Sequence, residues 1–211
     1  MEDRRDRIAI LVIHEIYGLN THIKDICENL KQLNYTVISP NLLEKVEYYT
    51  YKEENKAYLH FVNEIGFELA ANKIKVLARK LRSQFSELYI LGFSVGATIA
   101  WLCSNEFNLF NGAIGFYGSR IRDYLSVTPK CKTLLFFPEK EKSFDPNEII
   151  KELKEKNSTQ VIKVSSKHGF MDKLTSNYNE NDFKLCFKIM NKFILEQSNK
   201  KDQIYFKYGE I

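Results

Sequence analysis

Short apolar runs alternate along the chain with longer segments in which apolar residues recur every three to four positions. The runs are rich in valine, isoleucine, leucine and phenylalanine and show no polar face, which is typical of parallel strands buried on both sides. They span Ile8 to His14, Thr36 to Ser39, Leu88 to Gly92, Gly112 to Tyr117, Thr133 to Phe137 and Val161 to Val164. The alternation predicts an α/β protein with a mostly parallel sheet of about six strands and helices on both faces.

The segments between the runs have helical period. They are Thr21 to Gln32, Lys52 to Phe85, Val95 to Ser104, Asn147 to Lys156 and Glu180 to Gln197. The second is too long for one ordinary crossover helix and contains Gly66, so we expect a break there. An additional helix before the break could roof a pocket.

Composition narrows the class of protein. With 44% hydrophobic residues in a chain of 211, we expect one domain over residues 1–198, followed by a tail over residues 199–211. The net charge of +4 comes from dispersed lysines, so neither a nucleic-acid partner nor a membrane partner is expected. No signal-peptide pattern or long apolar stretch is visible, which favours the cytoplasm. The four cysteines are widely spaced, which predicts neither a disulfide framework nor a metal site.

The segment from Gly92 to Gly96 carries the sharpest chemical signal. It has the pattern Gly-x-Ser-x-Gly, follows an apolar run and opens a helical segment. This is the context of a nucleophile elbow, in which Ser94 projects from a strained turn between a strand and a helix. The glycines permit close backbone approach, and the helix N-terminus favours negative charge.

A serine nucleophile needs a base, and four histidines are available. Only His168 lies beyond the last predicted strand. This position fits the chain order of nucleophile, acid and histidine in folds that carry a nucleophile elbow. His22 and His60 occupy helical segments and are expected to face solvent. His14 ends the first strand and is expected to be a structural or lining residue.

The acid should follow the predicted strand that ends at Phe137. Glu139, Glu141 and Asp145 compete in that loop, and the position of Glu141 favours it over Asp145. A solvated charged turn is the alternative interpretation of the two glutamates. The oxyanion donors of this fold are backbone N–H groups after the nucleophile and after the first strand, here those of Val95 and Ile16.

Several motifs together resemble the dienelactone hydrolase family. They are His14 to Asn20, Tyr35 to Leu42, the elbow at Ser94, Gly115 to Gly118 and His168 to Phe170, and the resemblance covers about residues 7–197. It implies an α/β-hydrolase fold, and the early first strand predicts a sheet shortened at its N-terminal edge. It also implies that Glu15 lies beside the nucleophile and modulates it or contacts substrate, and that Tyr117 belongs to the site.

The chain departs from the family pattern at two places. Ser94 replaces the cysteine of the name-giving members, so serine-esterase chemistry is the better model. The stretch Phe170 to Lys173 lacks the arginine with which those members bind a substrate carboxylate, which argues against dienelactone itself. We expect a cofactor-free hydrolase of a small ester or lactone. A silent ligand-binding protein and a thioesterase or peptidase are the alternatives.

Overall fold

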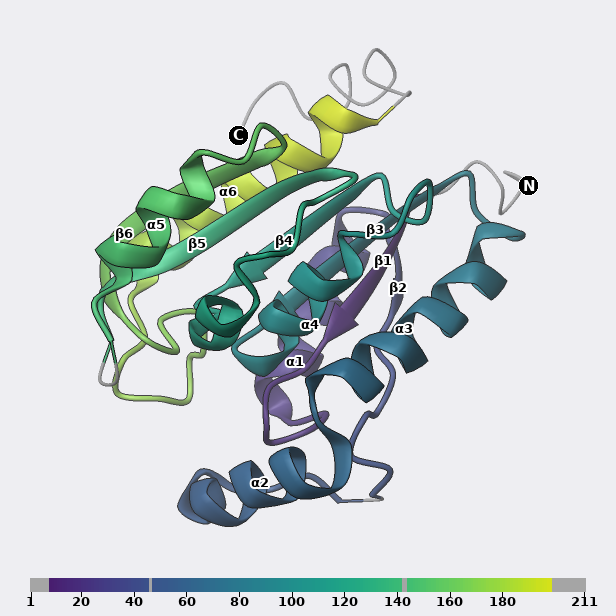
Figure 1. Ribbon diagram of the computed structural model, residues 1–211. Coiled ribbons are helices and arrows are strands. Elements are labelled where there is room, and N and C mark those ends of the chain that lie inside the picture. The colour runs from purple at the N-terminus through teal and green to yellow at the C-terminus, as the bar shows by residue number, and fades with distance from the viewer. Residues whose placement is uncertain (1–7, 46, 142–143, 199–211) are drawn as a thin grey trace.

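The computed structural model describes residues 8–45, 47–141 and 144–198, in which six strands form one parallel sheet (Figure 1). Its order is β2-β1-β3-β4-β5-β6. The strands are β1 (Ile8–Ile13), β2 (Thr36–Ile38), β3 (Glu87–Phe93), β4 (Gly112–Phe116), β5 (Lys132–Lys140) and β6 (Thr159–Lys167). The predicted α/β class is confirmed. The strand order reverses between β1 and β3, and such switch points are where open α/β sheets bind ligands, outside the carboxyl ends of the strands.

Helices cover both faces of the sheet (Figure 1). Alternate β1 residues Ile8, Ile10 and Val12 pack with α1 (Thr21–Gln32) and α6 (Glu180–Gln197). The intervening β1 residues pack toward α3 (Phe67–Arg82) and α4 (Val95–Cys103), and α5 (Pro146–Lys154) covers the same face beside β5. This two-sided burial explains why the central strands read as continuous apolar runs.

The last two strands differ from their predicted bounds. Both β5 and β6 are nine residues long, and their pairing extends from Thr133 with Thr159 to Lys140 with Lys167. Among the described residues, β6 forms an edge of the sheet, and seven of its nine residues are exposed or partly exposed. The expectation that it is apolar throughout was wrong, because an edge strand alternates inward and outward residues.

The long helical segment predicted over residues 52–85 is broken at Gly66, as expected. This residue has a φ of 68° and directly precedes α3. Before the break the chain forms the 3-10 turn η2 (Tyr51–Glu53), the helix α2 (Glu54–His60) and the π-helical turn η3 (Phe61–Ile65). We name residues 51–65 the roof. Figure 1 shows α2 beyond the carboxyl ends of the central strands, set apart from the helices that cover the faces.

Three phenylalanines at matched positions of adjacent strands tie the carboxyl ends of the sheet together. Phe93, Phe116 and Phe136 lie in register on β3, β4 and β5. The Phe93 and Phe116 rings stack with their centres 5.1 Å apart, and the Phe116 and Phe136 rings stack with their centres 4.5 Å apart. Cross-strand aromatic pairs of this kind stabilise a sheet beyond the area they bury. The strand ends that carry Ser94 and Tyr117 are therefore held rigidly.

Gly96 is required for the packing of α4 on β1. A Cβ atom at this position would lie 2.3 Å from the Ile13 carbonyl oxygen and 2.6 Å from that of His14. Both obstacles are backbone atoms and cannot rotate away, so Gly96→Ala is expected to lower the free energy of unfolding by about 3 kcal/mol or more. Urea denaturation measures this change.

Gly66→Ala is the matched control for this prediction. A Cβ at Gly66 meets nothing within 4 Å, so this variant adds only the strain of its positive φ. Its φ of 68° and ψ of 162° lie in a region nearly exclusive to glycine, so the expected cost is about 1 to 3 kcal/mol. A Gly96→Ala protein as stable as the Gly66→Ala protein would contradict the steric argument.

Candidate active site

The nucleophile elbow forms at the end of β3. Ser94 has a φ of 51° and a ψ of −114°, a conformation that non-glycine residues rarely adopt. Its N–H donates to the Phe116 carbonyl at 2.9 Å, which fixes the turn against β4. A Cβ at Gly92 would lie 2.0 Å from the Gly96 carbonyl oxygen, so the turn requires glycine there. The local sequence thus produces the strained turn that projects a serine side chain.

His168 reaches Ser94 from the loop after β6. Its Nε2 lies 3.2 Å from the Ser94 Oγ. The Asn177 side-chain amide donates to the His168 carbonyl at 2.9 Å, and the centre of the Tyr117 ring lies 4.8 Å from that of the imidazole. The backbone and the imidazole ring of His168 are therefore both held in place. The geometry suits a base that removes the serine proton.

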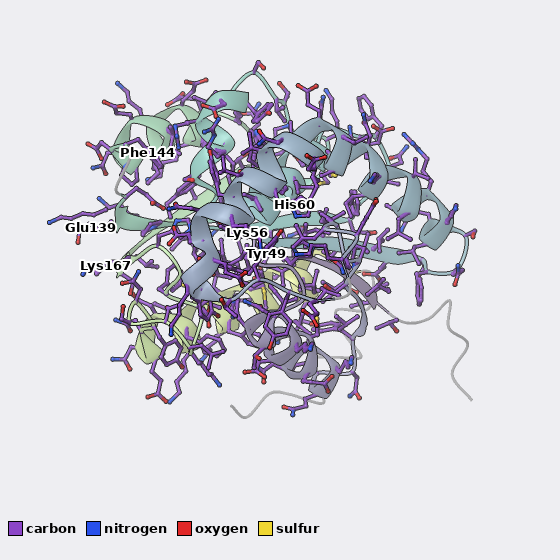
Figure 2. All side chains as sticks on the ribbon, turned by 90° about the horizontal axis from the view of Figure 1, so that it is seen from below. Tyr49, Lys56, His60, Glu139, Phe144 and Lys167 are labelled. Atoms are coloured by element: carbon purple, nitrogen blue, oxygen red, sulfur yellow. The ribbon has the colours of Figure 1, made fainter. Side chains whose placement is uncertain are left out.

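Glu141 is the carboxylate that contacts this histidine. Its Oε1 lies 2.8 Å from His168 Nδ1, and its side chain is only 6% exposed. Asp145 instead caps α5, accepting from the Asn147 N–H at 2.9 Å. Glu139 is exposed and points outward at the margin of the molecule (Figure 2). Of the three competing carboxylates, the structure brings only Glu141 together with His168.

Opposing effects act on the protonation of His168. Burial lowers its pKa, but the hydrogen bond and the charge of Glu141 raise it, with smaller contributions from Glu15 and Glu54. The net result is a pKa above the ordinary value of 6.5. Such a histidine holds a proton well in the presence of its carboxylate partner.

The two N–H groups predicted to form an oxyanion hole lie at the start of α4 and in the loop after β1. Val95 is the first residue of α4, where helix N–H groups have no intrahelical acceptor. Ile16 lies in the loop after β1, which the contact of Gly96 with Ile13 and His14 brings against the elbow. Among the hydrogen bonds between described loop residues, neither N–H is a donor. Both are therefore available to a developing negative charge.

Glu15 and Tyr117 are buried beside these groups. Burial raises the pKa of Glu15 above its ordinary value, and the charges of His22 and His168 oppose that rise only in part. Tyr117 has a φ of 43°, and its fully buried hydroxyl neighbours the Glu15 carboxyl. Burial also raises the pKa of Tyr117 well above its ordinary value. Burial therefore disfavours the charged form of both groups.

The expected solvent exposure of His22 and His60 was wrong. His22 is 3% exposed because α1 turns this side toward the sheet, and the centres of the His22 and Phe93 rings lie 5.1 Å apart in a T-shaped arrangement. His60 is half-buried, with its Nδ1 3.0 Å from the Tyr49 hydroxyl. His14, expected to be a lining or structural residue, is buried, and burial lowers its pKa to about 4.

Two residues that the sequence analysis did not assign to the site join the roof to the histidine loop. The Tyr51 hydroxyl donates to Asp172 Oδ2 at 2.5 Å, and the Leu174 N–H donates to Asp172 Oδ1 at 2.9 Å. The Tyr17 ring packs edge-on against Tyr51 at 4.9 Å. Tyr51 and Asp172 are 121 positions apart, so no local pattern links them. The one signal was the position of Asp172 shortly after His168.

This sheet, with an elbow serine at its switch point and a histidine after the last strand, is that of an α/β hydrolase. The model of the dienelactone hydrolase family matches residues 2–198, and the chain belongs to this family. The predicted family and fold are both confirmed. Within the described residues, no helix is long and apolar enough to cross a membrane, and no three His, Cys, Asp or Glu side chains form a metal-binding group.

Several relatives share parts of this chain. The Bacillus subtilis protein YczH is 41% identical over 163 residues, which are 76% of this chain and 79% of that protein. A Yersinia pestis protein named as a candidate carboxymethylenebutenolidase is 27% identical over 132 residues, and the match spans 58% of this chain but 47% of that protein. The chain therefore matches about half the length of the latter relative.

Solved structures share the fold at low sequence identity. A candidate dienelactone hydrolase from Klebsiella pneumoniae superposes with a TM-score of 0.75 at 20% identity, covering 90% of this chain and 88% of that one. A dienelactone hydrolase-like promiscuous phosphotriesterase from metagenomic libraries superposes with a TM-score of 0.74 at 14% identity, covering 90% and 87%.

Proposed function

We propose that this family member is a serine hydrolase that cleaves a small carboxylic ester or lactone through an acyl-enzyme on Ser94. The observation that carries the proposal is the hydrogen-bonded chain from Ser94 Oγ through His168 to the Glu141 carboxylate, with distances of 3.2 Å and 2.8 Å. Nucleophile, base and orienting acid at such distances are the arrangement of acyl-transfer enzymes. The family membership supports the same reaction class.

The reaction proceeds in two halves. Neutral His168 takes the Ser94 proton while Oγ attacks the carbonyl carbon, and the N–H groups of Val95 and Ile16 donate to the resulting oxyanion. The imidazolium then gives its proton to the leaving alcohol as the acyl-enzyme forms. A water molecule, deprotonated by His168, attacks the acyl carbon and releases the acid and free Ser94. Glu141 keeps the Nδ1 proton in place and stabilises the imidazolium throughout.

Glu15 and Tyr117 take supporting roles in this proposal. Burial disfavours a negative charge on Glu15 beside the elbow, where a carboxylate would oppose the developing oxyanion. The Tyr117 ring packs against the imidazole of His168 and limits its rotation. Glu15 therefore modulates the nucleophile or contacts the substrate, and Tyr117 positions the base. The reaction as proposed requires neither a metal nor an organic cofactor.

Active-site labelling tests the proposal directly. The purified protein is incubated with p-nitrophenyl acetate to measure turnover, and separately with a fluorophosphonate, which modifies activated serines. Peptide mass spectrometry is expected to locate the adduct on Ser94, in a reaction that prior incubation with ester slows. Absence of both turnover and adduct would overturn the proposal and favour a silent ligand-binding protein of the same fold.

The pH dependence of kcat/KM follows from the raised pKa of His168. The base must be neutral, so activity should fall as the pH drops, with a midpoint above 6.5. Glu141→Gln removes the hydrogen bond and charge that raise this pKa, so its midpoint should move to lower pH. Rates measured from about pH 5 to 9 test both statements. Asp145→Asn should leave the midpoint unchanged, whereas an upward move in Glu141→Gln would contradict the assignment.

A further inference from the structure

The acid and the base leave the sheet together, whereas the nucleophile leaves it two strands away. Glu141 and His168 directly follow Lys140 and Lys167, which pair at the ends of β5 and β6. Ser94 follows β3, and β4 lies between β3 and β5. The strand pair therefore fixes His168 relative to Glu141. The distance from His168 to Ser94 depends instead on what holds the loop after β6 against the rest of the molecule.

The histidine loop, residues 168–179, is closed by its own hydrogen bonds. The Asp172 N–H donates to the Gly169 carbonyl at 3.0 Å, and the Asn177 amide donates to the His168 carbonyl at 2.9 Å. Compact loops with internal bonds of this kind behave as units. A displacement of Asp172 therefore carries His168 with it.

The two carboxylate oxygens of Asp172 have different kinds of partner. Oδ1 accepts from the Leu174 N–H inside the loop at 2.9 Å, and Oδ2 accepts from the Tyr51 hydroxyl of the roof at 2.5 Å. The side chain is 1% exposed, and no lysine or arginine among the described residues forms an ion pair with it. Lys173, the next residue, lies over the Phe183 ring, with Nζ 5.2 Å from its centre. Tyr51 therefore supplies the donor from outside the loop that this buried carboxylate requires.

The Tyr51 hydroxyl is itself oriented by the loop after β1. The Asn20 side-chain amide donates to it at 3.4 Å. Asn20 is 4% exposed and is fixed in turn because its Oδ1 caps α1. The Tyr17 ring packs edge-on against the Tyr51 ring, as described above. One hydroxyl thus joins the roof to the loop that carries Ile16 and, through Asp172, to the loop that carries the base.

Ring packing provides a second contact between the histidine loop and the sheet. Phe170 is fully buried, and its ring centre lies 6.2 Å from that of Phe116 and 5.4 Å from that of Tyr117. Such packing stabilises the loop but depends only weakly on small displacements. The hydrogen bond from Tyr51 is short and directional. We therefore expect the rings to hold the loop on the sheet and the hydrogen bond to set its exact position.

We propose that Tyr51 and Asp172 are positioning residues, which hold the histidine loop so that His168 Nε2 stays within hydrogen-bond reach of Ser94 Oγ. This rests on the proposed ester hydrolysis. Neither residue needs to touch the substrate, because its effect passes through the loop backbone to the imidazole. Proton transfer from Ser94 is sensitive to displacements of about 1 Å. Loss of the hydrogen bond should therefore lower kcat and leave substrate binding nearly unchanged.

Tyr51→Phe tests this directly, because it keeps the ring and removes only the hydroxyl. The value of kcat for p-nitrophenyl acetate, measured per serine that a fluorophosphonate labels, is expected to fall about 10- to 100-fold, with KM within about twofold. The carboxylates that raise the pKa of His168 are unaltered, so the pH midpoint of kcat/KM should stay in place. An unchanged kcat in the folded variant would overturn the inference.

Tyr35→Phe is the matched control. The Tyr35 hydroxyl also donates at 2.5 Å, to Asn191 Oδ1, but it joins the start of β2 to α6, away from the catalytic groups. This variant should lower the urea midpoint and leave kcat unchanged. A merely structural role for Tyr51 predicts the same behaviour in both variants, and that result would contradict the inference.

A double-variant comparison tests whether the two residues act through one hydrogen bond. Asp172→Ala removes the acceptor, so adding Tyr51→Phe to it should change kcat by less than about twofold. Losses that multiply would show that Tyr51 does not act through Asp172 and would contradict the inference. If Asp172→Ala fails to fold, Tyr51→Phe and its Tyr35→Phe control still decide the question.

Nitrogen NMR of protein with labelled histidine rings separates this inference from the proposed reaction. In Tyr51→Phe, the His168 Nε2 signal should move toward its position in Ser94→Ala, in which the contact with Oγ is absent. The Nδ1 signal, which reports the contact with Glu141, should stay in place. If the natural protein hydrolyses no ester, the proposed function fails, and the Nε2 signal still tests the positioning. If it hydrolyses the ester but Tyr51→Phe changes neither kcat nor the Nε2 signal, the positioning alone fails.

Discussion

Ser94→Ala is expected to lower kcat for p-nitrophenyl acetate by about 10⁴- to 10⁶-fold. The substitution removes the Oγ atom that lies 3.2 Å from His168 Nε2, so no acyl-enzyme can form. Any remaining rate reflects water attack on a substrate held by the oxyanion donors. Steady-state kinetics measures the loss, and fluorophosphonate labelling should disappear with it.

The variant must also be shown to fold. Alanine retains the strained φ of 51° but loses no hydrogen bond other than that to His168, so the urea midpoint should change little. Ser83→Ala, at an exposed serine after α3, is the matched control and should keep full activity. A folded Ser94→Ala protein with normal turnover would rule out Ser94 as the nucleophile.

Glu141→Gln is expected to lower kcat by about 10³- to 10⁴-fold. The glutamine amide can donate its hydrogen to Nδ1 and so stabilise the tautomer that carries its proton on Nε2, which cannot accept from Ser94. It also no longer stabilises the imidazolium. The side chain is 6% exposed and 2.8 Å from the ring, so water does not readily replace it. Steady-state kinetics at a pH above the midpoint measures this effect separately from the titration of the base.

Asp145→Asn gives the comparison that decides between the two acids. Asparagine is also a good N-cap, so α5 should keep its hydrogen bond to the Asn147 N–H and the protein its stability. Its kcat should remain within about twofold of the natural protein, because the side chain makes no contact with His168. A large loss in Asp145→Asn beside a small one in Glu141→Gln would reverse the assignment.

The location of the site follows from the topology. Ser94 follows β3, and Glu15 and Ile16 follow β1, the two strands between which the order of the sheet reverses. The roof covers this point from beyond the strand ends, and Tyr51 joins it to the histidine loop through Asp172. Residues from the first and the last thirds of the chain therefore meet over one serine.

The sequence by itself determined the fold class, the elbow and the break at Gly66. Each depends on short-range information. The apolar runs reflect burial of a strand on both faces, and the elbow reflects glycines that only a close turn requires. Gly66 ends a helix because of its own backbone freedom. The position of His168 after the last strand was likewise a matter of order along the chain.

The tertiary structure decided which carboxylate meets His168, why His22 is buried, and how Tyr51 reaches Asp172. Glu139, Glu141 and Asp145 have similar chemistry, and only the path of the loop after β5 separates a paired side chain from an exposed one and a helix cap. Contacts across 27 or 121 positions arise from the packing of whole elements. Local periodicity and spacing carry no information about such contacts, because neither describes where distant loops end in space.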